Sequence, residues 1–329
     1  MTKIVVLGAN SFSGSHFVKY ALDKGDDVVG ISRSLEPNFY FLPRLWSSSL
    51  GSYQFYQLDI NNQSYEISRL LKEIEPQIVV NFIAQGMVAE SWREPWDWYY
   101  TNTVGLSKLL AALLELKNLK KYVHVTTPEV YGSTKSWIKE SDIFLPSTPY
   151  ATSRAAGDWH VLNLAKTFGL PAILTRAANV YGPGQQLYRV IPKAILSGLL
   201  GKPFPLHGDG LSTRSFIHIL DVVDATYKLT QSEFVGETFH ISTRELVSIL
   251  DLVDLVRKDL GEAYPINVSF MPERDGKDQT YQLDSSLIRK KIGWSDTVSL
   301  CDGISEVKKW IQRHLPELRE IPKEYLHKK

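Results

Sequence analysis

The sequence predicts an α/β protein whose main part is a doubly wound parallel sheet. Short apolar runs of strand length alternate with helical patterns through residues 1–176. The first of these runs ends in a turn of small residues that opens directly into a helix. After residue 177 the alternation gives way to loops, short strands and scattered helices. This change indicates a smaller, looser α/β lobe beside the sheet.

The composition excludes several classes of protein. A hydrophobic content of 43% and a charged content of 22% are typical of a globular chain in water. The net charge of +1 gives no electrostatic basis for binding nucleic acid, and no apolar run reaches membrane-spanning length. Cys301 is the only cysteine, and the eight histidines show no zinc-site spacing. We therefore expect a cytoplasmic, metal-free protein with no nucleic-acid or membrane partner.

The first predicted element is a buried strand at residues 3–7, followed by a turn and a helix. The turn contains Gly8, Asn10, Ser11, Phe12, Ser13 and Gly14. Free N–H groups at the start of a helix, together with the helix dipole, favour a bound phosphate. Because the turn joins a strand to a helix, it fits the dinucleotide-binding pattern, and the predicted domain is of the Rossmann type.

The second predicted strand, residues 27–31, ends without the acidic residue that usually binds the ribose 2′-hydroxyl of NAD. Ser32, Arg33 and Ser34 follow it instead. An arginine flanked by two hydroxyl groups suits a 2′-phosphate through charge-assisted hydrogen bonds. We therefore predict NADP as the cofactor, with NAD as the alternative, and contacts from Ser32 and Arg33.

Two more strands, residues 53–58 and 78–84, end in polar segments, and a long helix is predicted at about 98–117. Asp59 and Ile60 follow the third strand, and Ala84 and Gln85 end the fourth. In open α/β sheets ligands bind at the carboxyl edge of the strands. We therefore place Asp59, Ile60, Ala84 and Gln85 in the cofactor site.

The fifth strand, residues 122–126, leads to a hydroxyl and a carboxylate two residues apart, Thr127 and Glu129. In an extended segment they would point to the same side. Tyr150 and Arg154 then share one face of a helix. A guanidinium close to a phenol favours the phenolate, so we expect a lowered pKa that makes Tyr150 a base.

At the level of domains, we predict a Rossmann domain from residues 1–176 with residues 215–245 returning to it. Residues 177–214 and 246–329 form the predicted second lobe.

Several motifs in this order resemble one known family. The motifs are residues 8–14, 84–88, 126–132, Tyr150 with Arg154, 176–183, 201–203, 208–210 with Arg214, and 293–294. They resemble the extended short-chain dehydrogenase/reductases, in particular the nucleotide-sugar 4,6-dehydratases that act on dTDP-glucose or GDP-mannose. The resemblance covers nearly the whole chain and implies that the second lobe binds a nucleotide-diphosphate sugar.

The resemblance also implies a set of roles. Tyr150 would remove the proton of the sugar 4-hydroxyl, Thr127 would hydrogen-bond that oxygen, and Glu129 would abstract the C5 proton before water leaves from C6. Arg154 would support Tyr150 and contact a tightly bound, recycled cofactor. The substrate-binding residues implied are Gln85, Met87, Asn179, Arg214 and Arg274.

Four positions depart from the family pattern. Ser11 replaces the middle glycine of the turn, Arg154 replaces a lysine, and Met87 replaces a histidine. Pro128 stands where the family has an aspartate or serine, and the aspartate of the dTDP-glucose enzymes is taken as the acid for the departing hydroxyl. Since proline cannot donate a proton, another group must do so or the chemistry differs.

Three functions therefore remain open. A 4,6-dehydratase is supported by Glu129, and a related epimerase or 4-keto reductase is favoured by Pro128 and Arg154. The third is a non-catalytic nucleotide-sugar-binding protein. The resemblance further implies a homodimer or higher homo-oligomer, because the helices at 98–117 and after Tyr150 resemble the pair that forms a four-helix interface in the family.

Overall fold

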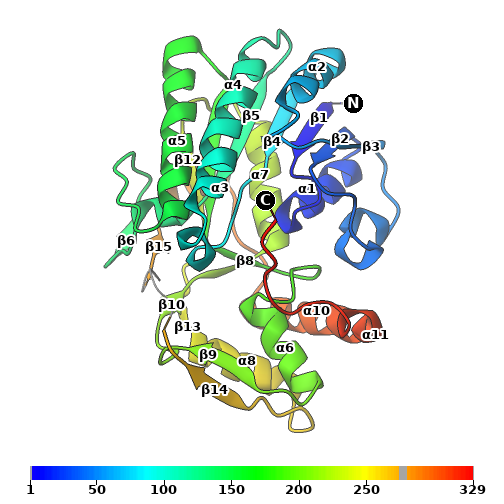
Figure 1. Ribbon diagram of the computed structural model, residues 1–329, viewed down its shortest axis with the longest axis vertical. Coiled ribbons are helices and arrows are strands. Elements are labelled where there is room, and N and C mark those ends of the chain that lie inside the picture. The colour runs from blue at the N-terminus through cyan, green and yellow to red at the C-terminus, as the bar shows by residue number, and fades with distance from the viewer. Residues whose placement is uncertain (1, 274–279, 329) are drawn as a thin grey trace.

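The computed structural model describes residues 2–273 and 280–328. Its main body is a parallel seven-stranded sheet in the order β12-β7-β5-β4-β1-β2-β3 (Figure 1). The strands are β1 (Lys3–Leu7), β2 (Asp27–Ser32), β3 (Tyr53–Gln57), β4 (Ile78–Asn81), β5 (Lys121–Thr126), β7 (Ala172–Ala177) and β12 (Thr238–Ile241). The order switches direction between β1 and β4, as in Rossmann folds, so the predicted fold class is confirmed.

Strands β1 and β4, in the middle of the sheet, are mostly apolar because both faces of the sheet are covered. Ile4 and Val6 of β1 pack into one hydrophobic cluster, and Val5 and Leu7 pack into another on the opposite face. All four side chains are fully buried. This alternation explains why β1 reads in the sequence as a continuous apolar run.

Helices cover both faces of the sheet. One cluster includes residues of α1 (Phe12–Asp23), α7 (Ile219–Thr230) and α9 (Ser286–Ile292). The opposite cluster includes residues of α2 (Ser64–Ile74), α4 (Leu106–Leu114) and α5 (Pro149–Phe168). The sheet is thus the middle of three layers, and its carboxyl edge is left for the site.

The long helix predicted at about 98–117 is present, but its middle is π-helical and it ends at Leu114. The chain forms α3 (Pro95–Tyr99), a π-helical turn (Tyr100–Gly105) and then α4. The wide turn contains Asn102, whose Oδ1 accepts from the N–H of Gln85 at 2.8 Å and whose Nδ2 donates to the Gln85 carbonyl at 3.0 Å. The interruption therefore holds the segment after β4 in place, and such bulges often occur at functional sites.

The second lobe lies below the sheet in Figure 1 and has its own hydrophobic core. Its main elements are α6 (Val190–Leu199), α8 (Ile249–Leu260), α10 (Leu300–Arg313), α11 (Leu315–Leu318), β9 (Phe204–His207) and β14 (Val268–Met271). Short strands connect the two parts: β6 (Trp137–Ile138), β8 (Asn179–Tyr181), β10 (Thr213–Arg214), β11 (Phe216–His218), β13 (Val247–Ser248) and β15 (Gln282–Leu283). Short 3₁₀ turns span Phe39–Phe41, Pro43–Leu45, Ala89–Trp92 and Pro128–Tyr131.

The division into residues 1–176 with 215–245, against 177–214 with 246–329, stays our proposal. Helix α9 falls in the second range, yet its Ile288 packs into a cluster of the sheet. Among the residues described, no helix combines the length and apolar character needed to cross a membrane.

Candidate active site

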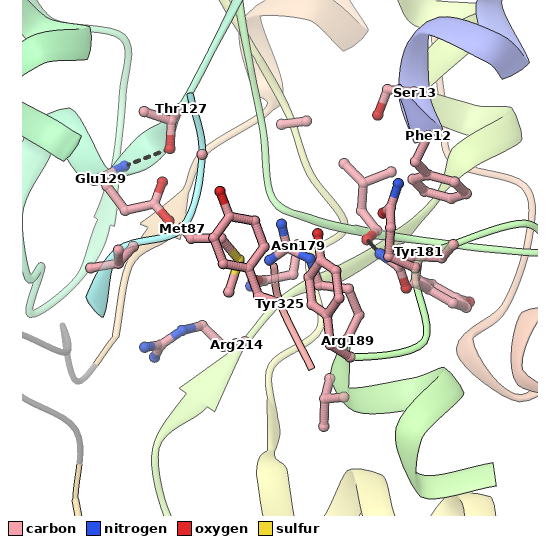
Figure 2. A pocket seen from close by; sticks show the side chains of 18 of the residues that line it. Phe12, Ser13, Met87, Thr127, Glu129, Asn179, Tyr181, Arg189, Arg214 and Tyr325 are labelled. Atoms are coloured by element: carbon pink, nitrogen blue, oxygen red, sulfur yellow. Dashed lines mark hydrogen bonds between the residues drawn. The ribbon is translucent and has the colours of Figure 1, made fainter. Parts of the chain in front are cut away.

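A cavity of about 720 Å³ lies where the carboxyl edge of the sheet meets the second lobe. Its walls come from the turns after β1, β2, β4, β5 and β7, from α5 and α6, and from the C-terminal segment. In Figure 2, Thr127 and Glu129 lie on one side of the cavity and Phe12 and Ser13 on the other. The volume falls in the usual range for a ligand-binding cleft.

The turn after β1 is shaped by two close approaches of backbone. Gly8 has φ +77°, and a Cβ there would lie 2.9 Å from the carbonyl carbon of Phe82. A Cβ on Gly14 would lie 2.2 Å from the Gly8 carbonyl oxygen. Ser11 caps α1 by accepting from the Gly14 N–H at 3.1 Å. The serine that replaces the family's glycine therefore has a structural role and leaves the helix N-terminus facing the cavity.

The turn after β2 is tied to the turn after β1. The N–H of Asn10 donates to Ser32 Oγ at 3.0 Å, and Asn10 Nδ2 donates to the Ser34 carbonyl at 2.9 Å. Arg33 lines the cavity, and its guanidinium donates to Gln85 Oε1 at 3.3 Å. Ser32 therefore stabilises the turn, while Arg33 lines the cavity.

The predicted cofactor residues divide into two groups. Ser11, Phe12, Ser13, Arg33, Ala84, Gln85, Tyr150 and Arg154 line the cavity. Gly8, Asn10, Gly14, Ser32, Asp59 and Ile60 are not among the lining residues. Asp59 accepts from Asn61 N at 3.0 Å and from Asn62 Nδ2 at 2.8 Å, which organises the turn before α2, and Ile60 is buried.

Helix α5 presents Tyr150 and Arg154 to the cavity from its first turns. Thr148 caps this helix and Pro149 occupies its first turn. Arg154 is 3% exposed and donates to the backbone carbonyls of Ile83, at 3.4 Å, and Val125. Its guanidinium therefore joins the ends of β4 and β5 to α5.

The extended geometry predicted for Thr127 and Glu129 is wrong. Thr127 is extended, but Pro128 starts a 3₁₀ turn, and the N–H of Glu129 donates to Thr127 Oγ1 at 3.3 Å. The turn folds Glu129 back toward Thr127, so both side chains still line the cavity (Figure 2). A proline suits the first position of such a turn because its φ is already set.

The lowered pKa predicted for Tyr150 is also wrong for the protein without ligands. Burial raises the pKa of the Tyr150 phenol, and the Glu129 carboxylate raises it further. Arg154, the hydrogen bond with Thr127, and Arg189 each favour the phenolate but do not outweigh these two effects. Sequence spacing identified Arg154 as a neighbour but gave no indication of the opposing carboxylate.

Asn179 and Arg214, the predicted diphosphate-binding residues, lie together in the cavity. Asn179 Nδ2 donates to the Ser215 carbonyl at 3.2 Å, and Arg214 donates to the Thr213 carbonyl at 2.7 Å. Met87 lines the same cavity with φ +71°, a left-handed conformation that is uncommon for a residue with a side chain. Arg274 lies outside the described residues.

The lining residues that sequence reasoning missed include two pairs that bear on the site. Arg189 stands just before α6 and influences the pKa of Tyr150, and Tyr188 precedes it. Tyr281 and Tyr325 come from the last fifty residues. The arginine directly before a helix was a readable signal for an anion site, but the sequence carries no pattern that brings either distant tyrosine to the sheet edge.

The C-terminal segment returns from α11 to the sheet edge (Figure 1). The hydroxyl of Tyr325 accepts from Gln85 Nε2 at 3.0 Å. His327 stacks on Trp98 with ring centroids 5.0 Å apart, and its Nε2 lies 2.7 Å from Asp97 Oδ2. Glu94 joins them, so three groups able to bind a metal ion lie within 4.8 Å of one another, a cluster that sequence spacing did not predict.

A buried polar network contacts the turn at Pro128–Tyr131. Arg176 forms an ion pair with Asp158 at 2.9 Å and donates to the Tyr131 hydroxyl. Although burial alone would raise the pKa of the Asp158 carboxyl, Arg176 and His124 hold it below its usual range. Tyr131 ends the turn that carries Glu129, and Asp158 lies on α5, so the network fixes these two elements against each other.

The residues present fit a dinucleotide cofactor. The glycine turn leaves no room for side chains, and the start of α1 faces the cavity. Farther in, Arg154 Nε and Thr126 Oγ1 are buried without a hydrogen-bond partner, beside Tyr150. Such groups are costly to leave unsatisfied, so they indicate a polar ligand there. The sheet, the turn and the Tyr-x-x-x-Arg helix together define an extended short-chain dehydrogenase/reductase.

The sequence profile of the GDP-mannose 4,6 dehydratase family matches residues 5–307, and the chain belongs to this family. The dTDP-glucose 4,6-dehydratase of Xanthomonas campestris is 29% identical over 330 residues, which cover 94% of this chain and 93% of that protein. A trifunctional enzyme of Arabidopsis thaliana, named in part as a UDP-glucose 4,6-dehydratase, is also 29% identical, and the match covers 93% of this chain but 46% of that protein.

Solved structures show the same likeness. The dTDP-glucose 4,6-dehydratase of Streptomyces venezuelae, solved with NAD bound, superposes with a TM-score of 0.86 at 28% identity, covering 96% of this chain and 98% of that one. The UDP-glucuronic acid 4-epimerase of Bacillus cereus, in complex with UDP-glucuronic acid and NAD, superposes with a TM-score of 0.85 at 28% identity, covering 95% and 99%.

Proposed function

We propose that the protein is a 4,6-dehydratase that converts a nucleotide-diphosphate hexose into the 4-keto-6-deoxy sugar. The observation that carries this proposal is the carboxylate of Glu129 in the same cavity as Tyr150 and Thr127. An oxidoreductase that only exchanges hydride at C4 needs the tyrosine but no second base. The family membership and the dehydratases among its relatives point the same way.

In this proposal Thr127 and Tyr150 act first. The Thr127 hydroxyl holds the sugar 4-oxygen, and Tyr150 takes the proton of the 4-hydroxyl as C4 is oxidised. A bound cofactor that carries a positive charge next to Arg154 would favour the phenolate form of Tyr150. This effect would oppose the burial that raises the pKa of Tyr150 in the protein without ligands. When bound, NADP or NAD supplies a hydride acceptor for C4 and returns the hydride to C6.

Glu129 acts second in this scheme. A ketone at C4 makes the C5 proton acidic, and Glu129 lies on the turn beside the group that holds the 4-oxygen. Its carboxylate abstracts that proton, and the hydroxyl at C6 leaves. Asn179, Arg189 and Arg214 would hold the diphosphate, since guanidinium groups bind phosphate through paired hydrogen bonds.

An epimerase or 4-keto reductase is the second candidate. Pro128 favours it because this position offers no proton for a departing hydroxyl. The likeness to a 4-epimerase, with a TM-score of 0.85, is close to that of the dehydratase. This candidate predicts a product that retains its C6 oxygen.

Glu129→Gln tests the proposal. The amide keeps the shape of the side chain and removes the base, so we expect oxidation at C4 to survive and elimination to slow by about 10²–10⁴-fold. The variant should accumulate reduced nicotinamide, seen by absorbance, and a 4-keto sugar that keeps its 6-hydroxyl, seen by mass spectrometry. Unchanged product formation by Glu129→Gln would contradict the proposed role.

A further inference from the structure

The proposed elimination requires a proton for the hydroxyl that leaves C6, and the inference below rests on that proposed function. Pro128 has no proton to give. Glu129 is a carboxylate when the reaction begins and carries a proton only after it has attacked C5. A weak acid near Glu129 on the described walls of the cavity would complete the site.

Tyr281 occupies such a position. It lines the cavity and is 6% exposed. Its hydroxyl donates to Asn179 Oδ1 at 3.0 Å, and the guanidinium of Arg214 lies over its ring at 5.0 Å from the centroid. Tyr281 shares the cavity with Glu129 and Tyr150, the two groups that act as bases in the proposed reaction.

The backbone on both sides of Tyr281 is fixed. The N–H of Thr134 donates to the Thr280 carbonyl at 2.9 Å, and the N–H of Gln282 donates to Thr134 Oγ1 at 3.0 Å. Strand β15 starts at Gln282 and pairs with β6. The backbone that carries the phenol is therefore held against the segment that follows the turn at Pro128–Tyr131.

The chemistry of this phenol suits an acid. Burial, followed by the Glu129 carboxylate, raises the pKa of Tyr281, so the hydroxyl keeps its proton when substrate binds. Arg214 opposes this shift and would stabilise the phenolate once the proton has left. Hydroxide is a stronger base than a phenolate, so a phenol can give its proton to the oxygen that leaves C6.

We propose that Tyr281 is the acid that protonates the departing C6 hydroxyl. The C5–H bond breaks and its proton goes to Glu129, while its electron pair forms the C5–C6 double bond and the C6–O bond breaks. The departing oxygen takes the Tyr281 proton and leaves as water. Hydride then adds to C6, and C5 takes a proton from Glu129 after that proton has exchanged with water. The Tyr281 phenolate takes a proton back from water, and Tyr150 releases to water the proton it took from the 4-hydroxyl, so all three groups end as they began.

The leaving group provides the test. Fluoride departs with far less need of protonation than hydroxide. We would measure formation of the 6-deoxy-4-keto product from dTDP-glucose and UDP-glucose, and from their 6-deoxy-6-fluoro analogues, with wild type and Tyr281→Phe. For the natural sugar we expect kcat to fall about 10²–10⁴-fold with KM nearly unchanged. For the fluoro sugar we expect Tyr281→Phe to work within about threefold of wild type.

Tyr227→Phe is the matched control, because it removes a hydroxyl that binds Asp26 at 2.8 Å, outside the cavity-lining residues. It should match wild type with both sugars. Two results would overturn the assignment of the acid: wild-type activity of Tyr281→Phe on the natural sugar, or an equal loss of activity on both sugars. Either result would leave the dehydratase proposal intact. If wild type yields no 6-deoxy product from these sugars or from GDP- and CDP-hexoses, the proposed function fails and the inference fails with it.

Discussion

The ionisation of Tyr150 depends on charged neighbours that act in opposite directions. Burial and the Glu129 carboxylate raise the pKa of the phenol, and Arg154 lowers it. At neutral pH the free protein therefore holds a protonated Tyr150. Since the phenolate is the base, the rate of C4 oxidation should rise with pH until Tyr150 is fully ionised.

Glu129→Gln should move this rising limb to lower pH, because it removes a negative charge that disfavours the phenolate. The measurement is the pH dependence of nicotinamide reduction in the first turnover, which this variant retains. Glu66→Gln, an exposed carboxylate on α2, is the control and should leave the profile unchanged. A limb that stays in place or moves to higher pH would contradict this electrostatic account.

Arg33 sets the expected choice of cofactor. Its guanidinium lines the cavity at the end of β2, where no acidic residue stands. One charge-assisted contact of about 1.5–3 kcal/mol predicts a ten- to hundredfold preference for NADP over NAD. Calorimetric titration of both cofactors into stripped protein measures it. Arg33→Ala should lose the preference for NADP. Arg313 is exposed, so Arg313→Ala is the control and should keep the preference. Equal affinities of wild type for the two cofactors would show that Arg33 does not bind a 2′-phosphate.

At the scale of elements, the C-terminal segment is the part that sequence reasoning did not connect to the site. Tyr325 and His327 face inward, while Leu326 between them is 65% exposed. The two inward residues bond Gln85, the side chain that also contacts Arg33. The segment therefore lies across the cavity where we place the cofactor.

Tyr325→Ala should accelerate release of bound cofactor by about two- to tenfold, the effect of one lost hydrogen bond. Displacement of reduced nicotinamide, followed by its fluorescence, measures the rate. Leu326→Ala removes a large side chain from the outer face of the same segment and is expected to release cofactor as wild type does. Equal rates in all three proteins would show that the segment does not cover the cofactor.

The elements also show what local patterns can predict. Helix α5 starts at Pro149 behind the cap Thr148, and such signals can be read locally because capping depends on neighbours in sequence. The π-helical turn was missed because it depends on Asn102 binding Gln85, a contact between elements. The turn after Thr127 was missed although its signals are local, since Pro128 starts it and the N–H of Glu129 donates to Thr127 Oγ1.

At the scale of the whole molecule, the sheet was the most predictable part. The strands in the middle of the sheet bury both faces and therefore carry their own apolar signal, as β1 illustrates. The sequence did not predict which residues face one another across the cavity. Tyr281 bonds Asn179 because β15, which begins at the next residue, pairs with β6. The predicted homodimer stays a prediction. The two helices expected at its interface expose large apolar side chains, Tyr100 on the π-helical turn and Trp159 on α5.

The measurement that tests the central claim most directly is the product formed in heavy water. We would incubate wild type with dTDP-, UDP-, GDP- and CDP-hexoses and analyse the products by mass spectrometry and NMR. Removal of the C5 proton by Glu129 and loss of water from C6 predict a 6-deoxy-4-keto sugar that carries deuterium at C5. A product that keeps its C6 oxygen would contradict the dehydratase and establish the epimerase or reductase in its place.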